Sequence, residues 1–321
     1  MPENSRAYGG HLVEAAGLVT PYANTRAGFV QMALERNNRA APYIAEARDL
    51  NAKAQEAKVP SELLNIAGIH GALLTAAGIS DKAAGHIDEV GQKEAIKGLI
   101  QTYLDPAGSS FREELVYRFL LTRGDTLGGS MRNVVGALAQ RRFTSMLLAR
   151  LRNAGTPFYY CVSGSTTWVP HTTEPSTAVL ETIKSMSWEN RLGGRVLSYN
   201  LKVPVVNKSV DMNLLNCLPN NFSKAVLADP SRFIALGELK GGIDPAGADE
   251  HWKTANSALD RIRKAFTTHG KKPALFFVGA AIEQAMAQEI WNHLQDGSLT
   301  NAANLTVDEH LTALCEWLVA V

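Results

Sequence analysis

The chain has 321 residues, of which 45% are hydrophobic and 20% are charged, a composition typical of a soluble globular protein with one large or two modest domains. Three widely spaced cysteines without a CxxC pair argue against a disulfide framework or a structural zinc site and favour a reducing compartment. No apolar stretch approaches the ~18 residues of a membrane span, and no signal peptide opens the sequence, so we expect a cytoplasmic protein.

The first hundred residues are predicted to be helical because their apolar residues recur at helical spacing. Expected helices cover residues 25–41, 42–57 and 60–79, punctuated by Pro42, Pro60 and Pro106. An amphipathic helix is expected from residue 111 to Gly124, and another over residues 134–155. Between them, the GGSMRN segment indicates a turn with a hydrogen-bonding Arg132.

From residue 156 the pattern changes to short apolar or β-branched segments bounded by Gly, Pro or Asn, as in strands. The expected strands lie at residues 156–164, 194–200, 202–216, 232–242 and 273–279. Helices are expected at residues 249–266 and 281–297, and a last one that Thr306 and Glu309 begin in capping-box spacing. These patterns predict an α/β protein with an all-helical N-terminal domain over 1–105 and an α/β domain over 106–321.

The net charge of +1 hides an uneven distribution along the chain. Residues 126–272 carry 19 Lys and Arg against 10 Asp and Glu, whereas residues 273–321 carry 6 acids and no Lys or Arg. The stretch from Thr126 to Thr173 has no acid but five arginines, Arg132, Arg141, Arg142, Arg150 and Arg152. Such a block suits a polyanion, and a solvated helix face is the alternative.

The chemistry is concentrated around residues 211–251. Glu238 and Lys240 are two apart in a strand-like segment and would project from the same face. Asp211 ends another strand-like run, so neighbouring strands would give two carboxylates for a hard cation such as Mg²⁺. Lys240 could then orient a water or stabilise phosphorane charge. The alternative for Glu238 and Lys240 is a surface ion pair.

The segment Glu238-Leu-Lys-Gly-Gly-Ile-Asp-Pro, followed by AGADEHWK, resembles the PD-(D/E)xK type II restriction endonucleases, most closely the AvaI/BsoBI group. Lys208 and Asp211 in NKSVD, the GDTLGGSMRN pattern and RAGFVQMALERN at 26–37 extend the resemblance over most of the chain. Val210 stands where the motif's name has proline. The resemblance implies a PD-(D/E)xK core, a central mixed sheet flanked by helices, behind a helical DNA-clasping domain.

The resemblance also assigns roles to residues of this chain. It implies that Asp211 and Glu238, with Leu239 between Glu238 and Lys240, hold the metal, that Lys240 acts on the nucleophile side and that His251 is a possible general base. A neutral imidazole could take a proton from water near physiological pH. A histidine that only packs or caps at its helix start is the alternative for His251.

Five residues are candidates for contacts with DNA. Asp244 could accept from a cytosine amino group and Lys208 could donate to guanine in the major groove. Lys82, Arg36 and Lys253 are further candidates, with a solvated helix face as the alternative for Arg36.

The function predicted is Mg²⁺-dependent double-strand cleavage of DNA by a type II restriction endonuclease, leaving 5′-phosphates. The resemblance implies a GC-rich palindrome of the CYCGRG kind, a prokaryotic source and a cognate methyltransferase acting on the same site. Because a palindrome is cut on both strands, a symmetric homodimer is expected. The alternatives are a PD-(D/E)xK repair or recombination nuclease and a DNA-binding protein that does not cut.

Overall fold

The computed structural model describes residues 6–170 and 175–321 and contains one mixed sheet of eight strands in the order β2-β1-β3-β4-β5-β6-β7-β8. Its first six strands pair antiparallel, and β7 and β8 continue the sheet in parallel from β6. The strands are β1 (Phe158–Val162), β2 (Val169–Pro170), β3 (Ile183–Asn190), β4 (Gly193–Val203), β5 (Lys208–Asn216), β6 (Phe233–Lys240), β7 (Ala274–Gly279) and β8 (Asn301–Asn304). The predicted α/β class with a mixed sheet is confirmed.

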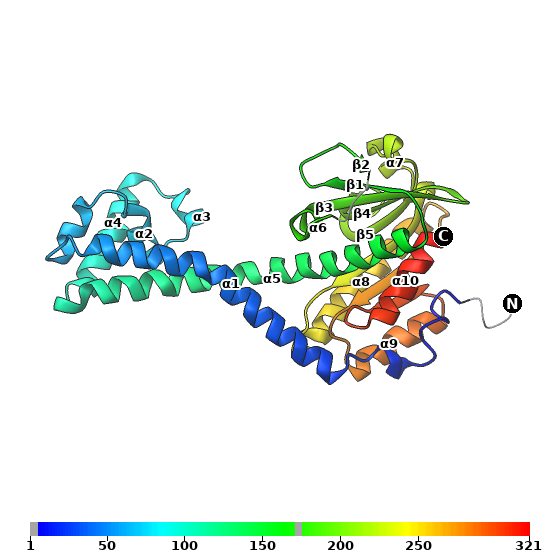
Figure 1. Ribbon diagram of the computed structural model, residues 1–321, viewed down its shortest axis with the longest axis horizontal. Helices are drawn as coiled ribbons and strands as arrows, with labels where there is room; N and C mark the ends of the chain where they lie inside the picture. The colour runs from blue at the N-terminus through cyan, green and yellow to red at the C-terminus, as the bar shows by residue number, and fades with distance from the viewer. Residues whose placement is uncertain (1–5, 171–174) are drawn as a thin grey trace. The chain divides into compact units, whose positions relative to one another are not determined.

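Helices cover both faces of this sheet (Figure 1). One face packs on α8 (Ala248–Thr267) and α9 (Gln284–Gln295), through apolar side chains such as Leu259, Phe266 and Ile290. The other face packs on α10 (Asp308–Ala320) and on the C-terminal part of α5 (Phe111–Asn153). The short α6 (Thr177–Thr182) and α7 (Lys224–Ala228) lie in connections between strands.

The chain divides into two compact units whose limits differ from the expected 1–105 and 106–321. The sheet unit comprises residues 1–29 and 135–321, and the helical unit comprises residues 30–134. Residues before α1 belong with the sheet because they bond to its edge strand: Asn301 Nδ2 donates to Ala7 O at 3.1 Å, and Asn304 Nδ2 donates to Leu18 O at 2.9 Å. These two asparagine side chains are fully buried.

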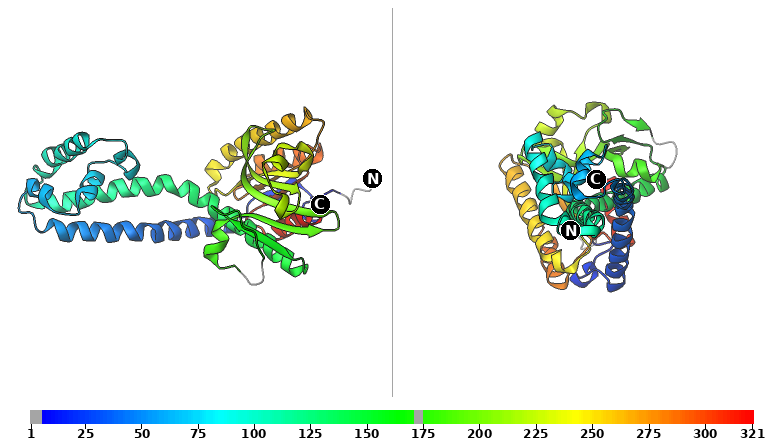
Figure 2. Two further views of the ribbon diagram at one scale, coloured as in Figure 1. Left: turned by 90° about the horizontal axis from the view of Figure 1, so that it is seen from above. Right: turned by 90° about the vertical axis from the view of Figure 1, so that its left-hand side faces the viewer.

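Every element of the helical unit, all of whose residues are described, is helical. Two long helices, α1 (Tyr22–Ala54) and α5, lie side by side in it (Figure 2), with α2 (His70–Ala76), α3 (Asp81–Ala84) and α4 (Glu89–Leu99) in the connection between them. Its core holds Leu50, Leu63, Leu73, Ile96, Leu104, Leu115 and Phe119, each at most 2% exposed. The helical N-terminal part predicted from apolar periodicity is confirmed.

Two expected helix breaks are wrong. Pro42 lies inside α1, and Gly124 and the GGSMRN segment lie inside α5, so Arg132 is an exposed helical residue rather than part of a turn. Proline removes one helical hydrogen bond and glycine costs only about 1 kcal/mol relative to alanine, so packing can override both. On α5, Leu127, Met131 and Val134 are buried at helical spacing across the predicted break.

Three further differences concern the C-terminal half. The Thr306 hydroxyl donates to Asn304 Oδ1 at 2.7 Å instead of capping α10, whose N-cap is Val307. Strands β2, β3 and β8 are absent from the sequence prediction, because β2 has only two residues and IKSMSWEN and NAAN lack an apolar or β-branched run. Strand β8 forms by pairing with β7.

Among the described residues, no helix is long and apolar enough to cross a bilayer.

The buried His310 should make stability depend on pH. Burial lowers the pKa of His310 to about 4, helped by the His11 ring 5.4 Å away and opposed by the carboxylate of Glu309. An unfolded histidine has a pKa near 6.5. Between pH 6.5 and about pH 4, the unfolded chain therefore binds a proton at this histidine that the folded chain does not bind. We therefore expect the free energy of unfolding to fall, by up to about 3 kcal/mol, as the pH drops from 6.5 towards 4.

Urea unfolding at pH 7 and pH 5 checks this expectation. His310→Gln, which cannot titrate, should flatten the dependence. An equally steep dependence in that variant would show that the loss of stability arises elsewhere.

Candidate active site

The site lies where β5 and β6 run side by side in the middle of the sheet. These antiparallel strands pair Met212 with Gly237, and the same register sets Asp211 beside Glu238. Lys240 ends β6, two residues after Glu238, so both side chains leave the strand on one face. The structure therefore brings together the three residues that the sequence predicts as the chemical centre.

Lys240 bridges the two carboxylates. Its Nζ donates to Asp211 Oδ2 at 2.9 Å and to Glu238 Oε2 at 2.7 Å. The backbone N–H of Leu239 also donates to Asp211 Oδ2, at 3.0 Å. The side chain of Glu238 is 5% exposed and that of Lys240 is 20% exposed, so the alternative of a solvated surface ion pair is not what the structure contains.

Burial dominates the electrostatics of this cluster. Burial and, to a smaller extent, the adjacent charge of Asp211 raise the pKa of Glu238, Lys240 opposes both, and the net result is a pKa of about 7. Burial would lower the pKa of Lys240, but the charges of Glu238 and Asp211 hold it above its usual value. Two neighbouring carboxylates with one cation between them form a site whose negative charge is incompletely neutralised.

These residues fit a hard divalent cation. The carboxylates of Asp211 and Glu238 lie close enough to raise the pKa of Glu238, and a cation between them would reverse that effect. Leu239 could contribute only its backbone carbonyl, because its side chain is apolar and packs against the core. Within the described parts of the chain, no cluster of three or more His, Cys, Asp or Glu side chains is placed to hold a metal. A site with two carboxylates suits Mg²⁺, which keeps several waters.

His251 lies beside the turn that follows β6. It is half-buried in the first turn of α8, as the sequence predicted. Its ring lies so close to Gly242 that a Cβ on this glycine would stand 2.2 Å from His251 Cε1. The imidazole is therefore held against the backbone two residues beyond Lys240. It forms no ion pair with any of the residues that the structure describes.

The candidate DNA contacts are all exposed, and they lie in both units. Lys208 begins β5, three residues before Asp211, and Asp244 precedes α8. Asp244 Oδ1 already accepts from Ala246 N at 3.0 Å, so this carboxylate caps a short 3-10 turn. Lys253 on α8 forms an exposed ion pair with Asp249. In the helical unit, Arg36 lies on α1 and Lys82 on α3.

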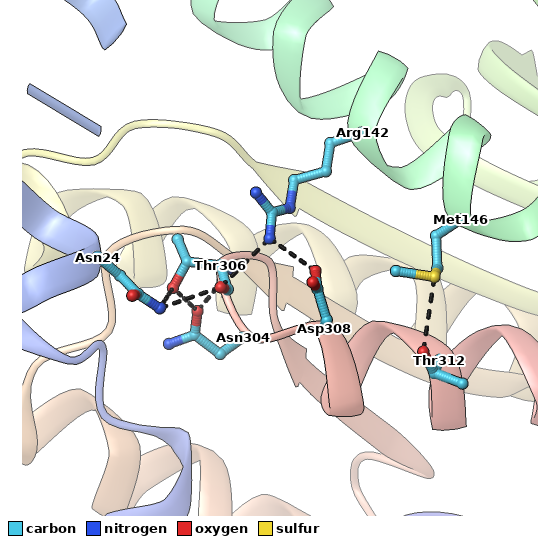
Figure 3. A network of polar contacts seen from close by, with 7 residues as sticks. All are labelled: Asn24, Arg142, Met146, Asn304, Thr306, Asp308 and Thr312. Atoms are coloured by element: carbon cyan, nitrogen blue, oxygen red, sulfur yellow. Dashed lines mark hydrogen bonds and ion pairs between the residues drawn. The ribbon is translucent and has the colours of Figure 1, made fainter. Parts of the chain in front are cut away.

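The arginine block is less free than its sequence suggests. Arg141 pairs with Glu181, Arg150 with Glu316, and Arg142 with Asp308 at 2.9 Å. Figure 3 shows Arg142 reaching from α5 to the start of α10, where it also donates to Thr306 O at 3.3 Å. These three ion pairs connect α5 to α6 and α10, so Arg141, Arg142 and Arg150 are neither unpaired nor simply a solvated helix face.

Sequence reasoning missed one ion-pair network in the helical unit. The guanidinium of Arg123 pairs with Asp81 at 2.7 Å and with Glu46 at 3.2 Å, and it is mostly buried. Asp81 is the neighbour of Lys82 at the start of α3, so Arg123 holds the element that presents this lysine. Because Arg123 and Asp81 are 42 residues apart, no local sequence pattern indicates their ion pair.

The chain is similar to known proteins over nearly its whole length. A family model described as "Restriction endonuclease BsobI" matches residues 8–321. The type II restriction enzyme AvaI of Nostoc sp. is 50% identical over 309 residues, covering 96% of this chain and 98% of that enzyme, and AvaI of Anabaena variabilis matches equally. The type II restriction enzyme BsoBI of Geobacillus stearothermophilus is 48% identical over 314 residues, covering 97% of each chain.

Proposed function

The chain belongs to the AvaI/BsoBI family of type II restriction endonucleases, and from this premise we propose that it cuts DNA at the cluster of Asp211, Glu238 and Lys240. The observation that carries the proposal is the bridge of Lys240 Nζ to both carboxylates, at 2.9 and 2.7 Å, on adjacent central strands. This is the arrangement expected of a PD-(D/E)xK core. A type II restriction enzyme is a site-specific deoxyribonuclease.

We propose that Asp211 and Glu238 bind Mg²⁺, with the carbonyl of Leu239 as a further ligand. A bound Mg²⁺ would polarise the scissile phosphate and acidify a water. Lys240, whose ammonium is held by two carboxylates, orients the attacking water and offsets charge that develops on the phosphate. The bond between phosphorus and O3′ breaks, so one product ends in a 3′-hydroxyl and the other carries a 5′-phosphate.

His251 is the proposed general base. Its contact with Gly242 supports this role, because it places the imidazole beside the turn that follows Lys240. A general base contributes about 10²–10⁴-fold, so His251→Ala should slow single-turnover cleavage at least about 100-fold at pH 7. The pH dependence of the cleavage rate should lose one ionisation in that variant. Identical pH profiles for the variant and the wild type would leave His251 with a packing role only.

Base reading and DNA positioning are proposed for the exposed residues. Lys208 and Asp244 lie near the chemical centre in sequence and are candidates for guanine and cytosine contacts at a GC-rich palindrome of the CYCGRG kind. Lys82, Arg36 and Lys253 would contact DNA farther from the chemistry, and the helical unit would serve to clasp DNA. A palindromic site implies a homodimer with one site per subunit, and a cognate methyltransferase that modifies the same site.

Digestion of phage DNA with and without Mg²⁺, followed by sequencing of the fragment ends, tests the proposed function. We expect discrete fragments that begin with a 5′-phosphate at one palindromic sequence, and no cutting when EDTA replaces Mg²⁺. A smear of random ends would favour a repair or recombination nuclease. Binding without any cutting would favour a DNA-binding protein.

A further inference from the structure

The turn at residues 241–243, directly after the strand that carries Glu238 and Lys240, is contacted closely by three helices. Glycine at each contact point lets backbone and side chain approach closer than any larger residue would allow. Two of the three helices, α1 and α5, continue from the sheet unit into the helical unit. The turn is therefore a physical link between these two helices and the end of β6.

Helix α1 reaches the turn through Gly28. A Cβ built on Gly28 would stand 2.4 Å from Ile243 Cγ1 and 3.2 Å from its Cβ and Cδ1. Ile243 is half-buried and packs against the core that α5 and α10 form on the sheet. Glycine inside a helix is less favourable than alanine, so this position has a packing reason to be small.

Helix α5 reaches the turn from another side. A Cβ on Gly241 would stand 2.6 Å from Ala139 Cβ and 2.8 Å from the carbonyl oxygen of Val135. The next residue, Gly242, carries the His251 ring against its backbone. The three residues that follow Lys240 therefore contact three helices: Gly241 contacts α5, Gly242 contacts α8 and Ile243 contacts α1.

Both long helices also donate to one backbone oxygen, from Asn24 and Arg142, each about one helical turn away from the residues that contact 241–243. Asn24 Nδ2 of α1 donates to Thr306 O at 3.0 Å, and Arg142 Nη2 of α5 donates to the same oxygen at 3.3 Å (Figure 3). The Thr306 hydroxyl donates to Asn304 Oδ1, and this bond fixes the position of Thr306. The stretches of α1 and α5 that touch the turn therefore start from a common anchor.

We propose that Gly28, Gly241 and Ile243 are positioning residues for the cleavage step, through which α1 and α5 set the place of Lys240 and His251. The proposal rests on the proposed active site. Its physical basis is the cost of misplacement, because a shift of about 1 Å at reacting groups can lower a rate on the order of 10²-fold. Contacts that DNA makes along these helices would reach the chemistry by this route.

Gly28→Ala tests the proposal, because alanine improves helix propensity and would stabilise α1 if no clash occurred. We expect single-turnover cleavage of a cognate duplex to slow about 30-fold or more, with affinity for that duplex, measured without Mg²⁺, changed less than threefold. Ile243→Ala leaves only a Cβ, 3.2 Å from the new methyl group. The double variant should therefore cleave at the rate of Ile243→Ala alone, which we expect to be about three- to tenfold below wild type because that variant loses the contact with α1.

Gly136→Ala is the matched control, since this exposed glycine of α5 has no atom within 4 Å of an added Cβ, and it should cleave at the wild-type rate. Wild-type cleavage by Gly28→Ala would overturn the proposal, as would a double variant as slow as Gly28→Ala. Parallel losses of melting temperature, affinity and rate would show a structural role only. If Gly28→Ala does not fold, slowing of Ile243→Ala at unchanged affinity carries the test, and an unchanged rate would overturn it. Lys240→Ala separates failure of this proposal from failure of the proposed active site, because it should slow cleavage at least about 100-fold even if Gly28 and Ile243 have no positioning role.

Discussion

Replacing Lys240 with alanine is expected to slow DNA cleavage at least about 100-fold while changing duplex affinity by less than about threefold. The ammonium holds both carboxylates, at 2.9 and 2.7 Å, and would offset charge that develops only as the phosphate is attacked. An interaction made only in the transition state lowers kcat and kcat/KM equally, so single-turnover rates at saturating enzyme should show the whole effect.

Lys264→Ala provides the control for Lys240→Ala. Lys264 also pairs with an aspartate, Asp260, but its side chain is 77% exposed on α8 and lies in none of the proposed contacts. We expect this variant to cleave like the wild type. Unchanged cleavage by Lys240→Ala would remove Lys240 from the chemistry and leave it as a structural bridge.

Asp211→Asn should have a still larger effect, on the order of 10³-fold or more, and should abolish the dependence of the remaining rate on Mg²⁺. The amide keeps an oxygen that can accept from Leu239 N, as Asp211 Oδ2 does at 3.0 Å, so this bond between β5 and β6 should survive. It also removes the charge that raises the pKa of Glu238. The melting temperature without metal should therefore stay level or rise while activity is lost.

The measurement pairs cleavage rates over a range of Mg²⁺ concentrations with thermal unfolding in EDTA. Asp260→Asn, an exposed carboxylate on α8 that pairs with Arg263 and Lys264, is the control and should keep activity. If Asp211→Asn lost activity and melted well below the wild type, the loss would reflect misfolding. Retained Mg²⁺-dependent cleavage would place the metal elsewhere.

The meeting of Asp211, Glu238 and Lys240 could be predicted from sequence because it follows from local rules, whereas the chemical roles proposed for them come from the family resemblance. Alternation along β6 puts Glu238 and Lys240 on one face, and an antiparallel neighbour brings Asp211 beside them. Burial could not be predicted in the same way. The covering of Glu238 by other parts of the chain raises its pKa, and this covering depends on the complete fold.

Other features lay beyond local rules because packing between distant segments decides them. Pro42 and Gly124 signal helix ends, yet α1 and α5 run through both. Strand β8 has a sequence with little strand propensity and forms at the sheet edge beside the N-terminal residues. The contact of Gly28 with Ile243 joins residues more than 200 positions apart, so only the lone glycine in a helical pattern hinted at it.

The most direct test of the proposed active site is the position of the metal. Mn²⁺ can be introduced into crystals of the enzyme with cognate duplex and located by anomalous scattering. We predict a peak about 2.0–2.2 Å from a carboxylate oxygen of Asp211 and from one of Glu238, with the scissile phosphate as a further ligand. A peak bound by other side chains, with Asp211 and Glu238 still joined only through Lys240, would contradict the proposed site.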